Sequence, residues 1–293
     1  MKTLTRIKRS NGSHWVGDGF PVRNIFSYQD IAAEMSPFLF LDYAGPTDFP
    51  PGDRHRGVGQ HPHRGFETVT LVYSGGVEHR DSAGGGGCIG PGDVQWMTAG
   101  SGVLHEEFHS PDYARQGGPF EMVQLWVNLP ARAKMAPPAY QAIAAAAIPC
   151  LALPDAAGTA RIVAGNYGDI QGPARTFTPM NVWDLRLAAE RHVSFDLADG
   201  HGAALFVLRG EIRIAPDTVV RDAELAVFSR SGRGIACDIL RDSVVLLLSG
   251  APLDEPIVGR GPFVMNSEDE IRAAYADFHA GLFGGIEAHA TGR

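Results

Sequence analysis

The stretch HPHRGFE, from His61 to Glu67, places two imidazoles and a carboxylate within seven residues. The residues FETVTLVY, which overlap its end, are β-branched and aromatic and predict a strand over residues 66–73. Alternate residues of a strand face the same side, so one continuous strand would present His61, His63 and Glu67 together. An H-x-H pair can place two ring nitrogens on one cation, about 2.0–2.1 Å away if it is zinc. The stretch therefore predicts half of a metal site.

A second cluster, HEEFH, follows at residues 105–109. By the same alternation His105 and Glu107 share a face, while Glu106 points away. The two stretches together offer three imidazoles and one carboxylate, a set that suits Fe, Mn, Ni, Cu or Zn and leaves open positions on a six-coordinate metal. A single histidine is more often a surface or core group than a ligand. Four candidates on the same faces of two strand segments favour metal binding.

The fold class follows from turn residues and from a weak internal repeat. Glycine and proline account for 36 and 20 of the 293 residues and separate short β-type segments, which is typical of an all-β protein. ETVTLVYSGGVEHR and PGDVQWMTAGSGV recur in outline as AALFVLRGEIRI and DAELAVFSRSGRG. The repeat predicts two tandem β-barrels rather than one large sandwich.

An alanine- and proline-rich crossover after Pro130 separates the two expected barrels, with at most a short helix over residues 140–147. We place an N-terminal metal-binding domain at residues 1–135 and a degenerate C-terminal domain at residues 136–293. The second domain has no H-x-H, and its His201 sits in a glycine turn, which indicates a loop histidine. A capped amphipathic helix is expected over residues 267–283, because Ser267 and Glu270 have capping-box spacing.

Charge and cysteine content limit the partners and the compartment that are expected for the protein. A net charge of −8 argues against a general nucleic-acid-binding surface. The three cysteines lie far apart, with no CxxC spacing, as in a reducing compartment. The N-terminal residues have no apolar signal-peptide region, and the longest apolar run, over residues 244–248, is too short to span a bilayer. We therefore expect a cytoplasmic protein with no direct nucleic-acid or membrane partner.

The spacing of the two clusters also resembles a known superfamily. HPHRGFE matches cupin motif 1, H-x-H-x3-E, and residues 91–105, which begin PGD and end VLH, match cupin motif 2. Within the cupins, HPHRGFET, PGDVQWMTAGSGVLHEE, VQLWVNLP and GPFVMNS resemble the pirin family closely, and the likeness runs through nearly the whole chain from Val16 onward.

The resemblance implies a bicupin, two tandem double-stranded β-helix (jelly-roll) barrels, with one divalent metal in the N-terminal barrel. Pirin ligands carry over to His61, His63, His105 and Glu107. Fe²⁺ is the first expectation, with Mn, Co, Ni, Cu or Zn as alternatives. Because the pirin pattern takes its carboxylate from motif 2, we assign Glu67 to the surroundings of the metal instead of to its ligands.

The resemblance further implies a quercetin 2,3-dioxygenase-like oxidoreductase. The metal would act as a Lewis acid on the 3-hydroxyl of a flavonol, Glu107 would take its proton as general base, and O2 would open the heterocycle with loss of carbon monoxide. Trp96, Met97 and Phe40 are the candidates for the pocket wall, although plain barrel core is the alternative for such apolar residues.

Two other functions stay open at this point. Pirins also act as transcriptional co-regulators or as partners of metabolic enzymes, so the chain could be a metal- or redox-dependent regulatory protein that binds a transcription factor or an enzyme. Another cupin reaction, sugar isomerisation or acid decarboxylation, would need a cation to grip an anionic substrate. Arg64 points off the metal face in the strand alternation, which lowers that third alternative.

Overall fold

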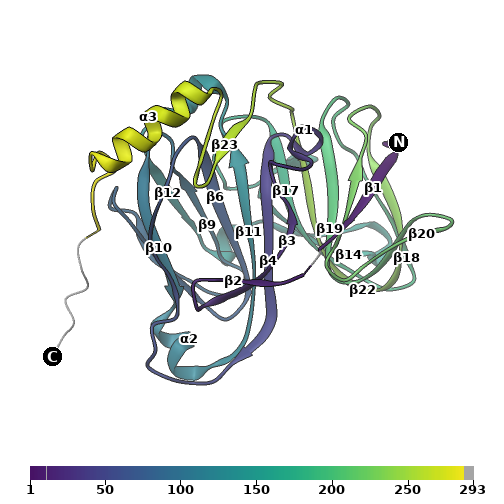
Figure 1. The fold of residues 1–293 in the computed structure, drawn as a ribbon. Helices are drawn as coiled ribbons and strands as arrows, with labels where there is room; N and C mark the ends of the chain where they lie inside the picture. Colours follow the sequence, from purple (N-terminus) through teal and green to yellow (C-terminus); the bar gives the residue numbers. More distant parts are fainter. Residues whose placement is uncertain (11, 287–293) are drawn as a thin grey trace.

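The structure, a computed structural model, describes residues 1–10 and 12–286 and consists of two β-barrels side by side (Figure 1). The all-β class, the tandem barrels and the short C-terminal helix are confirmed. In the N-terminal barrel a seven-stranded sheet has the order β12-β9-β6-β11-β4-β3-β2, and a four-stranded sheet has the order β5-β10-β7-β8. Apolar residues from both sheets form the core between them, including Val22, Val77 and Phe120.

The strands of the N-terminal barrel have the following bounds: β2 (His14–Val16), β3 (Phe20–Phe26), β4 (Phe38–Phe49), β5 (Gly57–His63), β6 (Phe66–Ser74), β7 (Val77–Asp81), β8 (Gly86–Ile89), β9 (Val94–Thr98), β10 (Val103–His109), β11 (Gly118–Asn128) and β12 (Ala139–Ile143). Two short helices belong to this half, α1 (Ala32–Met35) and α2 (Pro111–Gln116).

The C-terminal barrel is built from a nine-stranded sheet. Its strands are β1 (Leu4–Arg9), β13 (Cys150–Ala152), β14 (Gly158–Ala164), β17 (Met180–Leu187), β18 (Arg191–Phe195), β19 (Gly202–Ala215), β20 (Thr218–Arg221), β21 (Glu224–Phe228) and β22 (Ile235–Gly250). Two small hairpins complete the described elements, β15 (Asn166–Tyr167) with β16 (Ile170–Gln171) and β23 (Val258–Arg260) with β24 (Phe263–Met265).

A large apolar core lies between the barrels. Val69, Leu71 and Trp96 from the N-terminal barrel belong to the same buried cluster as Phe206 and Leu248 from the C-terminal barrel. Strand β6 is buried on both faces over most of its length, which explains its nearly continuous apolar and β-branched sequence. Burial of each large apolar side chain here contributes on the order of 1.5–3 kcal/mol, so the two barrels stabilise one another.

When the chain is divided between residues 135 and 136, each half contributes a strand to the sheet of the other half. Strand β1 pairs with β21 of the C-terminal sheet, whereas β12 pairs with β9 of the N-terminal sheet. The predicted boundary therefore does not separate the two sheets. Within residues 140–147, where at most a short helix was expected, residues 140–143 lie in the edge strand β12 and a 3-10 turn follows at Ala145–Ala147.

The predicted C-terminal helix is present as α3 (Glu268–His279), drawn in yellow in Figure 1. Ser267 caps it by accepting from the backbone N–H of Glu270. Arg64 ties it to the N-terminal barrel, with Nη1 at 2.8 Å from Asp277 Oδ2 and the guanidinium over the Phe283 ring. Among the described residues, every helix is too short or too polar to cross a membrane.

Candidate metal centre

Three histidines converge where strands β5 and β10 pair. These strands are antiparallel, and His105 lies opposite His61 in their register. The ring centroids of His61, His63 and His105 are 4.2–4.9 Å apart. One nitrogen from each ring can be chosen so that all three lie within 4.8 Å of one another. Such convergence is the arrangement that a single cation requires.

The hydrogen bonds of these three rings involve Nδ1, which leaves Nε2 of each ring available for a metal. Nδ1 of His61 lies 2.8 Å from the Gly59 carbonyl oxygen, and Nδ1 of His63 lies 3.3 Å from that of Pro262. His105 uses its Nδ1 toward another histidine, and its buried Nε2 has no hydrogen-bond partner in the described part of the chain. A buried nitrogen without a partner is costly unless a ligand uses it. The three Nε2 atoms thus fit a metal ion.

Burial also sets the protonation that a metal site needs. Desolvation lowers the pKa of both His63 and His105 well below the ordinary histidine value, and the neighbouring His61 lowers both further. Both rings are therefore neutral near pH 7, with one lone pair each for coordination.

Glu107, the fourth predicted ligand, lies on the same strand as His105 and lines the adjoining cavity. Its Oε1 accepts a hydrogen bond from Gln95 Nε2 at 2.6 Å, and Thr70 Oγ1 lies 3.3 Å from the same oxygen. Its carboxylate comes within 4.8 Å of nitrogens of His105 and of His79, a residue that the sequence had not singled out. The structure therefore contains two overlapping trios that share His105.

A row of polar side chains crosses the floor of the N-terminal barrel. Strand pairing places Gln95, Thr70, Gln124, Asp42 and Asn24 opposite one another on five adjacent strands. Thr70 Oγ1 donates to Gln124 Oε1 at 2.7 Å, and Asn24 Nδ2 donates to Asp42 Oδ1 at 2.9 Å. Burial raises the pKa of Asp42 to about 6 against the opposing bond from Asn24. Two members of the row, Gln95 and Thr70, contact the Glu107 carboxylate.

Glu67 does not join the histidines, contrary to the sequence expectation. The chain turns at Gly65, with φ of +89°, and the strands before and after it belong to different sheets. The alternation therefore does not continue from His63 to Glu67. Glu67 shares its face with Val69 and Leu71, which belong to the core between the barrels, and accepts a hydrogen bond from Thr98. Burial raises the pKa of Glu67 to about 7.

The corner at Gly65 requires glycine and is stabilised by hydrogen bonds from a buried lysine. A Cβ at this position would overlap the carbonyl oxygen of Val264, and positive φ disfavours other residues. The buried Lys134 donates from Nζ to the carbonyl oxygens of Gly65 and Val264 and to Asn128 Oδ1, each at 2.8 Å. Gly65 and Lys134 together fix the backbone at this corner, and with it the orientation of the preceding HPH segment.

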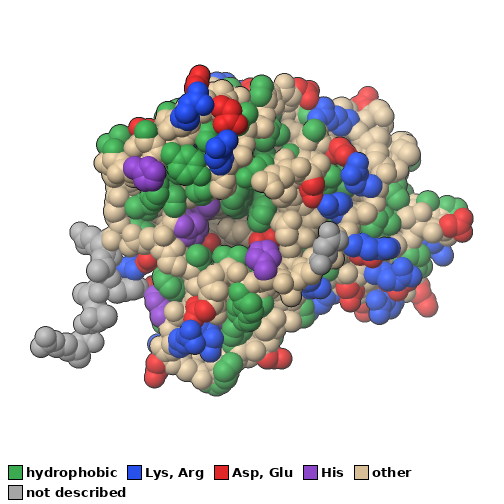
Figure 2. Space-filling view, in the orientation of Figure 1, with side chains coloured by type: hydrophobic (Ala, Val, Ile, Leu, Met, Phe, Trp, Pro, Cys, Tyr) green, Lys and Arg blue, Asp and Glu red, His purple; other side chains and the backbone are tan. Residues whose placement is uncertain are grey.

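A cavity of about 350 Å³ opens beside the histidines, and Figure 2 shows histidine side chains around a hollow on the face of the N-terminal barrel. Its polar lining comes from His61, His63 and Glu107 with Asp42 and Gln124. Its apolar lining consists of Val16, Phe20, Val22, Phe40, Val58, Met122 and Trp126. A volume of this size is within the range of about 300–1,000 Å³ that is usual for small-molecule sites.

Of the three residues proposed for the pocket wall, only Phe40 lines this cavity, where its ring packs on Trp126 at 4.7 Å. Strand β9 is covered on both faces, which removes Trp96 and Met97 from the wall. Trp96 lies in the core between the barrels, and Met97 packs with Ala99 and Val103. Most of the apolar wall comes from β3, β4 and β11, whose apolar alternation looks like ordinary core in the sequence.

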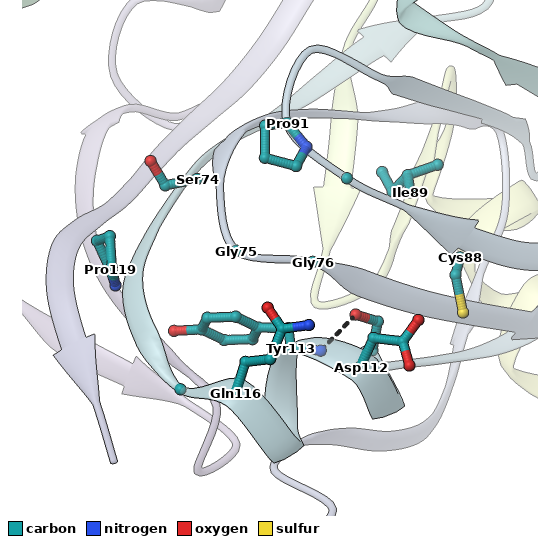
Figure 3. A pocket seen from close by; sticks show the side chains of 13 residues that line it. Ser74, Gly75, Gly76, Cys88, Ile89, Pro91, Asp112, Tyr113, Gln116 and Pro119 are labelled. Atoms are coloured by element: carbon teal, nitrogen blue, oxygen red, sulfur yellow. Dashed lines mark hydrogen bonds between the residues drawn. The ribbon is translucent and has the colours of Figure 1, made fainter. Parts of the chain in front are cut away.

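A larger hollow of about 530 Å³ lies against α2 (Figure 3). Tyr113, Cys88 and Asp112 are among the residues that face it. None of the described residues that line it is a histidine, and Asp112 is its single acidic group. Size alone therefore does not identify the chemically equipped site, which is the smaller cavity beside His61.

Comparisons with known proteins identify relatives of this chain. A Pseudomonas aeruginosa protein named as a candidate quercetin 2,3-dioxygenase is 56% identical over 99% of this chain and all of its own length. The chain belongs to the pirin family. The pirin domain matches residues 19–127, and the pirin C-terminal cupin domain matches residues 182–284.

Two further pirin relatives connect the chain to a characterised fold. Human pirin is 35% identical, with 94% of this chain and 91% of the human protein aligned. The crystal structure of a quercetin 2,3-dioxygenase from Acinetobacter baumannii superposes with a TM-score of 0.95 at 50% identity, covering 98% of this chain and 100% of that one. The pirin bicupin fold is therefore shared over essentially the whole length.

Proposed function

We propose that this pirin-family protein is a metal-dependent dioxygenase that opens the heterocycle of flavonols such as quercetin with O2. The observation that supports this most is the convergence of His61, His63 and His105, with one nitrogen of each ring within 4.8 Å of the others, beside a largely apolar cavity of about 350 Å³. His61, His63, His105 and Glu107 would hold one divalent transition metal, Fe²⁺ as the first candidate, with Mn, Co, Ni, Cu or Zn as alternatives. The names of the bacterial relatives support the same reaction class.

The cavity fits a flat aromatic substrate with hydroxyl groups. Phe20, Phe40 and Trp126 supply aromatic and apolar surface for the ring system. Asp42 and Gln124 supply hydrogen-bonding atoms within an otherwise apolar wall, where hydroxyl groups of the substrate find partners. A bound flavonol would displace water from the histidine end of the cavity, which strengthens electrostatic interactions there.

Glu107 is the group proposed to receive the proton of the flavonol hydroxyl. Gln95 donates to its Oε1, and Thr70 Oγ1 lies 3.3 Å from the same oxygen, so Oε2 is the oxygen left to take the proton. A divalent metal bound by the histidines would supply Lewis acidity toward the oxygen that loses this proton. Glu107 thus acts beside the site where charge develops.

The test is the loss of flavonol absorbance when quercetin is added in air to protein loaded with Fe²⁺, Mn²⁺, Co²⁺, Ni²⁺ or Cu²⁺. We expect turnover with at least one metal, and loss of turnover in His61→Ala and Glu107→Gln. His192→Ala, an exposed histidine of the C-terminal barrel, is the matched control and keeps activity. Metal binding without turnover for all five metals would contradict the proposal and favour a metal-dependent regulatory protein.

A further inference from the structure

Two side chains outside the predicted ligand set form a chain of contacts to His105. Strand β7 lies next to β10, and its register places Asp81 opposite His105 and His79 opposite Glu107. His79 Nδ1 lies 3.4 Å from His105 Nδ1, and His79 Nε2 lies 3.1 Å from Asp81 Oδ2. His79 and His105 are fully buried, so solvent does not compete for these contacts.

Asp81 is a fixed acceptor at the outer end of this chain. Its Oδ1 accepts from the backbone N–H groups of Ala83 at 2.9 Å and Gly85 at 2.8 Å, within the turn that joins β7 to β8. Its other oxygen is directed to His79. A carboxylate accepts and does not donate, so the nitrogen of His79 that faces it, Nε2, carries the hydrogen.

Because Asp81 acts as an acceptor, the ring nitrogen that carries the hydrogen can be assigned in both His79 and His105. When His79 carries one hydrogen, on the Nε2 that faces Asp81, its Nδ1 has a lone pair and accepts from His105. His105 must then carry its hydrogen on Nδ1 and keep the lone pair on Nε2. That atom is the buried nitrogen with no hydrogen-bond partner among the described residues. Asp81 and His79 therefore select the form of His105 that offers Nε2 to a metal.

The orientation of the His79 ring is fixed as well. Tyr140 from β12 stacks on it, with centroids 4.9 Å apart and planes 15° from parallel. The Tyr140 hydroxyl donates to Gln95 Oε1 at 3.3 Å. A Cβ at Gly85 would overlap both Asp81 and Tyr140, so the packing here requires glycine. His79 cannot turn without breaking contacts on two sides.

We propose that His79 and Asp81 are positioning residues that hold His105 in its Nε2-ligating tautomer. This inference rests on the proposed function only insofar as His105 is a metal ligand. The alternative is that His79 is itself a ligand with His105 and Glu107, since these three also lie within 4.8 Å. The contacts favour positioning, because both ring nitrogens of His79 already have partners in Asp81 and His105.

The test uses Cu²⁺ as the probe metal and the full chain. Affinity is measured by competition with a chromophoric chelator, and the coordinated imidazoles are counted by pulsed electron paramagnetic resonance. We expect His79→Phe and Asp81→Asn each to lower the affinity 10–100-fold while three imidazoles remain coordinated. The matched controls, His192→Phe and Asp238→Asn, disrupt an exposed His–Asp contact of 2.9 Å in the other barrel and leave affinity unchanged.

The outcomes separate the inference from the proposed function. Loss of one imidazole from the count in His79→Phe would overturn positioning and make His79 a ligand. Unchanged affinity in both Asp81→Asn and His79→Phe would also overturn it. If His79→Phe fails to fold, as judged by circular dichroism, Asp81→Asn decides alone. A wild-type protein with the expected copper signals but no flavonol turnover with any of the five metals would contradict the dioxygenase and leave the positioning role intact.

Discussion

Gln95 Nε2 donates a hydrogen bond of 2.6 Å to Glu107 Oε1 inside the N-terminal barrel. The two residues come from β9 and β10, which belong to different sheets, so this bond crosses the barrel interior. Gln95 also donates to Thr70, and Tyr140 donates to Gln95. The carboxylate proposed as general base is therefore held by a connected network of buried polar side chains.

Substitution Gln95→Leu should lower kcat by about 10–100-fold, because Glu107 loses the 2.6 Å hydrogen bond from Gln95. Metal content should change little, since the histidine trio does not contact Gln95 in any hydrogen bond between described residues. Steady-state kinetics and elemental analysis check both expectations. Gln141→Leu, on the neighbouring strand β12, is the control, because the hydrogen bonds of the Gln141 side chain within the described residues go to the exposed backbone of Arg175. Unchanged kcat in Gln95→Leu would show that Glu107 needs no such support.

Substitution Val58→Phe tests whether the cavity is the substrate site. Val58 lines the cavity and is partly exposed, so a larger side chain can be accommodated without overpacking the core. We expect KM for quercetin to rise at least tenfold, with metal content unchanged. Val219→Phe, at a partly exposed position of β20, is the matched control. If Val58→Phe has the KM of the wild type, the flavonol binds elsewhere.

Glu67 should make stability depend on pH in a specific window. Its pKa in the folded protein, about 7, is above the ordinary value of 4.5. The folded state therefore keeps a proton that the unfolded chain releases, and stability falls as pH rises from 4.5 to 7. Glu67→Gln removes this effect. Its free energy of unfolding relative to wild type should increase across that window by on the order of 2–3 kcal/mol.

Urea denaturation of the metal-free protein at several pH values measures this difference. Glu268→Gln, at an exposed acid at the start of α3, provides the comparison. Its free energy of unfolding relative to wild type should not change with pH. If the free energy of unfolding of Glu67→Gln relative to wild type also stays constant with pH, Glu67 is ionised in the folded protein across this window.

The strands and the ligand candidates could be predicted because their determinants are local. Alternation within β5 and within β10 depends only on neighbouring residues, and both H-x-H and H-x-E lie inside single strands. The capped helix α3 is equally local. Glu67 was misplaced because a corner at Gly65 resets the alternation, and a glycine in HRGFE is equally compatible with a continuous strand.

His79 and the cavity walls depend on which strands become neighbours. The H-x-D pattern of His79 and Asp81 indicates a shared face, but its approach to His105 follows from the pairing of β7 with β10. Residues 139–143 resemble a linker and become strand β12 only because β9 offers a free edge. Trp96 and Met97 look like wall residues, but Trp96 packs in the core between the barrels and Met97 packs against Val103 of β10.

The fate of dioxygen is the most direct measurement of the proposed reaction. Quercetin is incubated with the metal-loaded protein under ¹⁸O2, and the product is examined by mass spectrometry. A flavonol dioxygenase places both labelled atoms in the ring-opened product and releases one carbon monoxide per flavonol consumed. We expect this result for the wild-type protein and no product from Glu107→Gln. Consumption of quercetin with one labelled atom or none in the product would contradict the assignment.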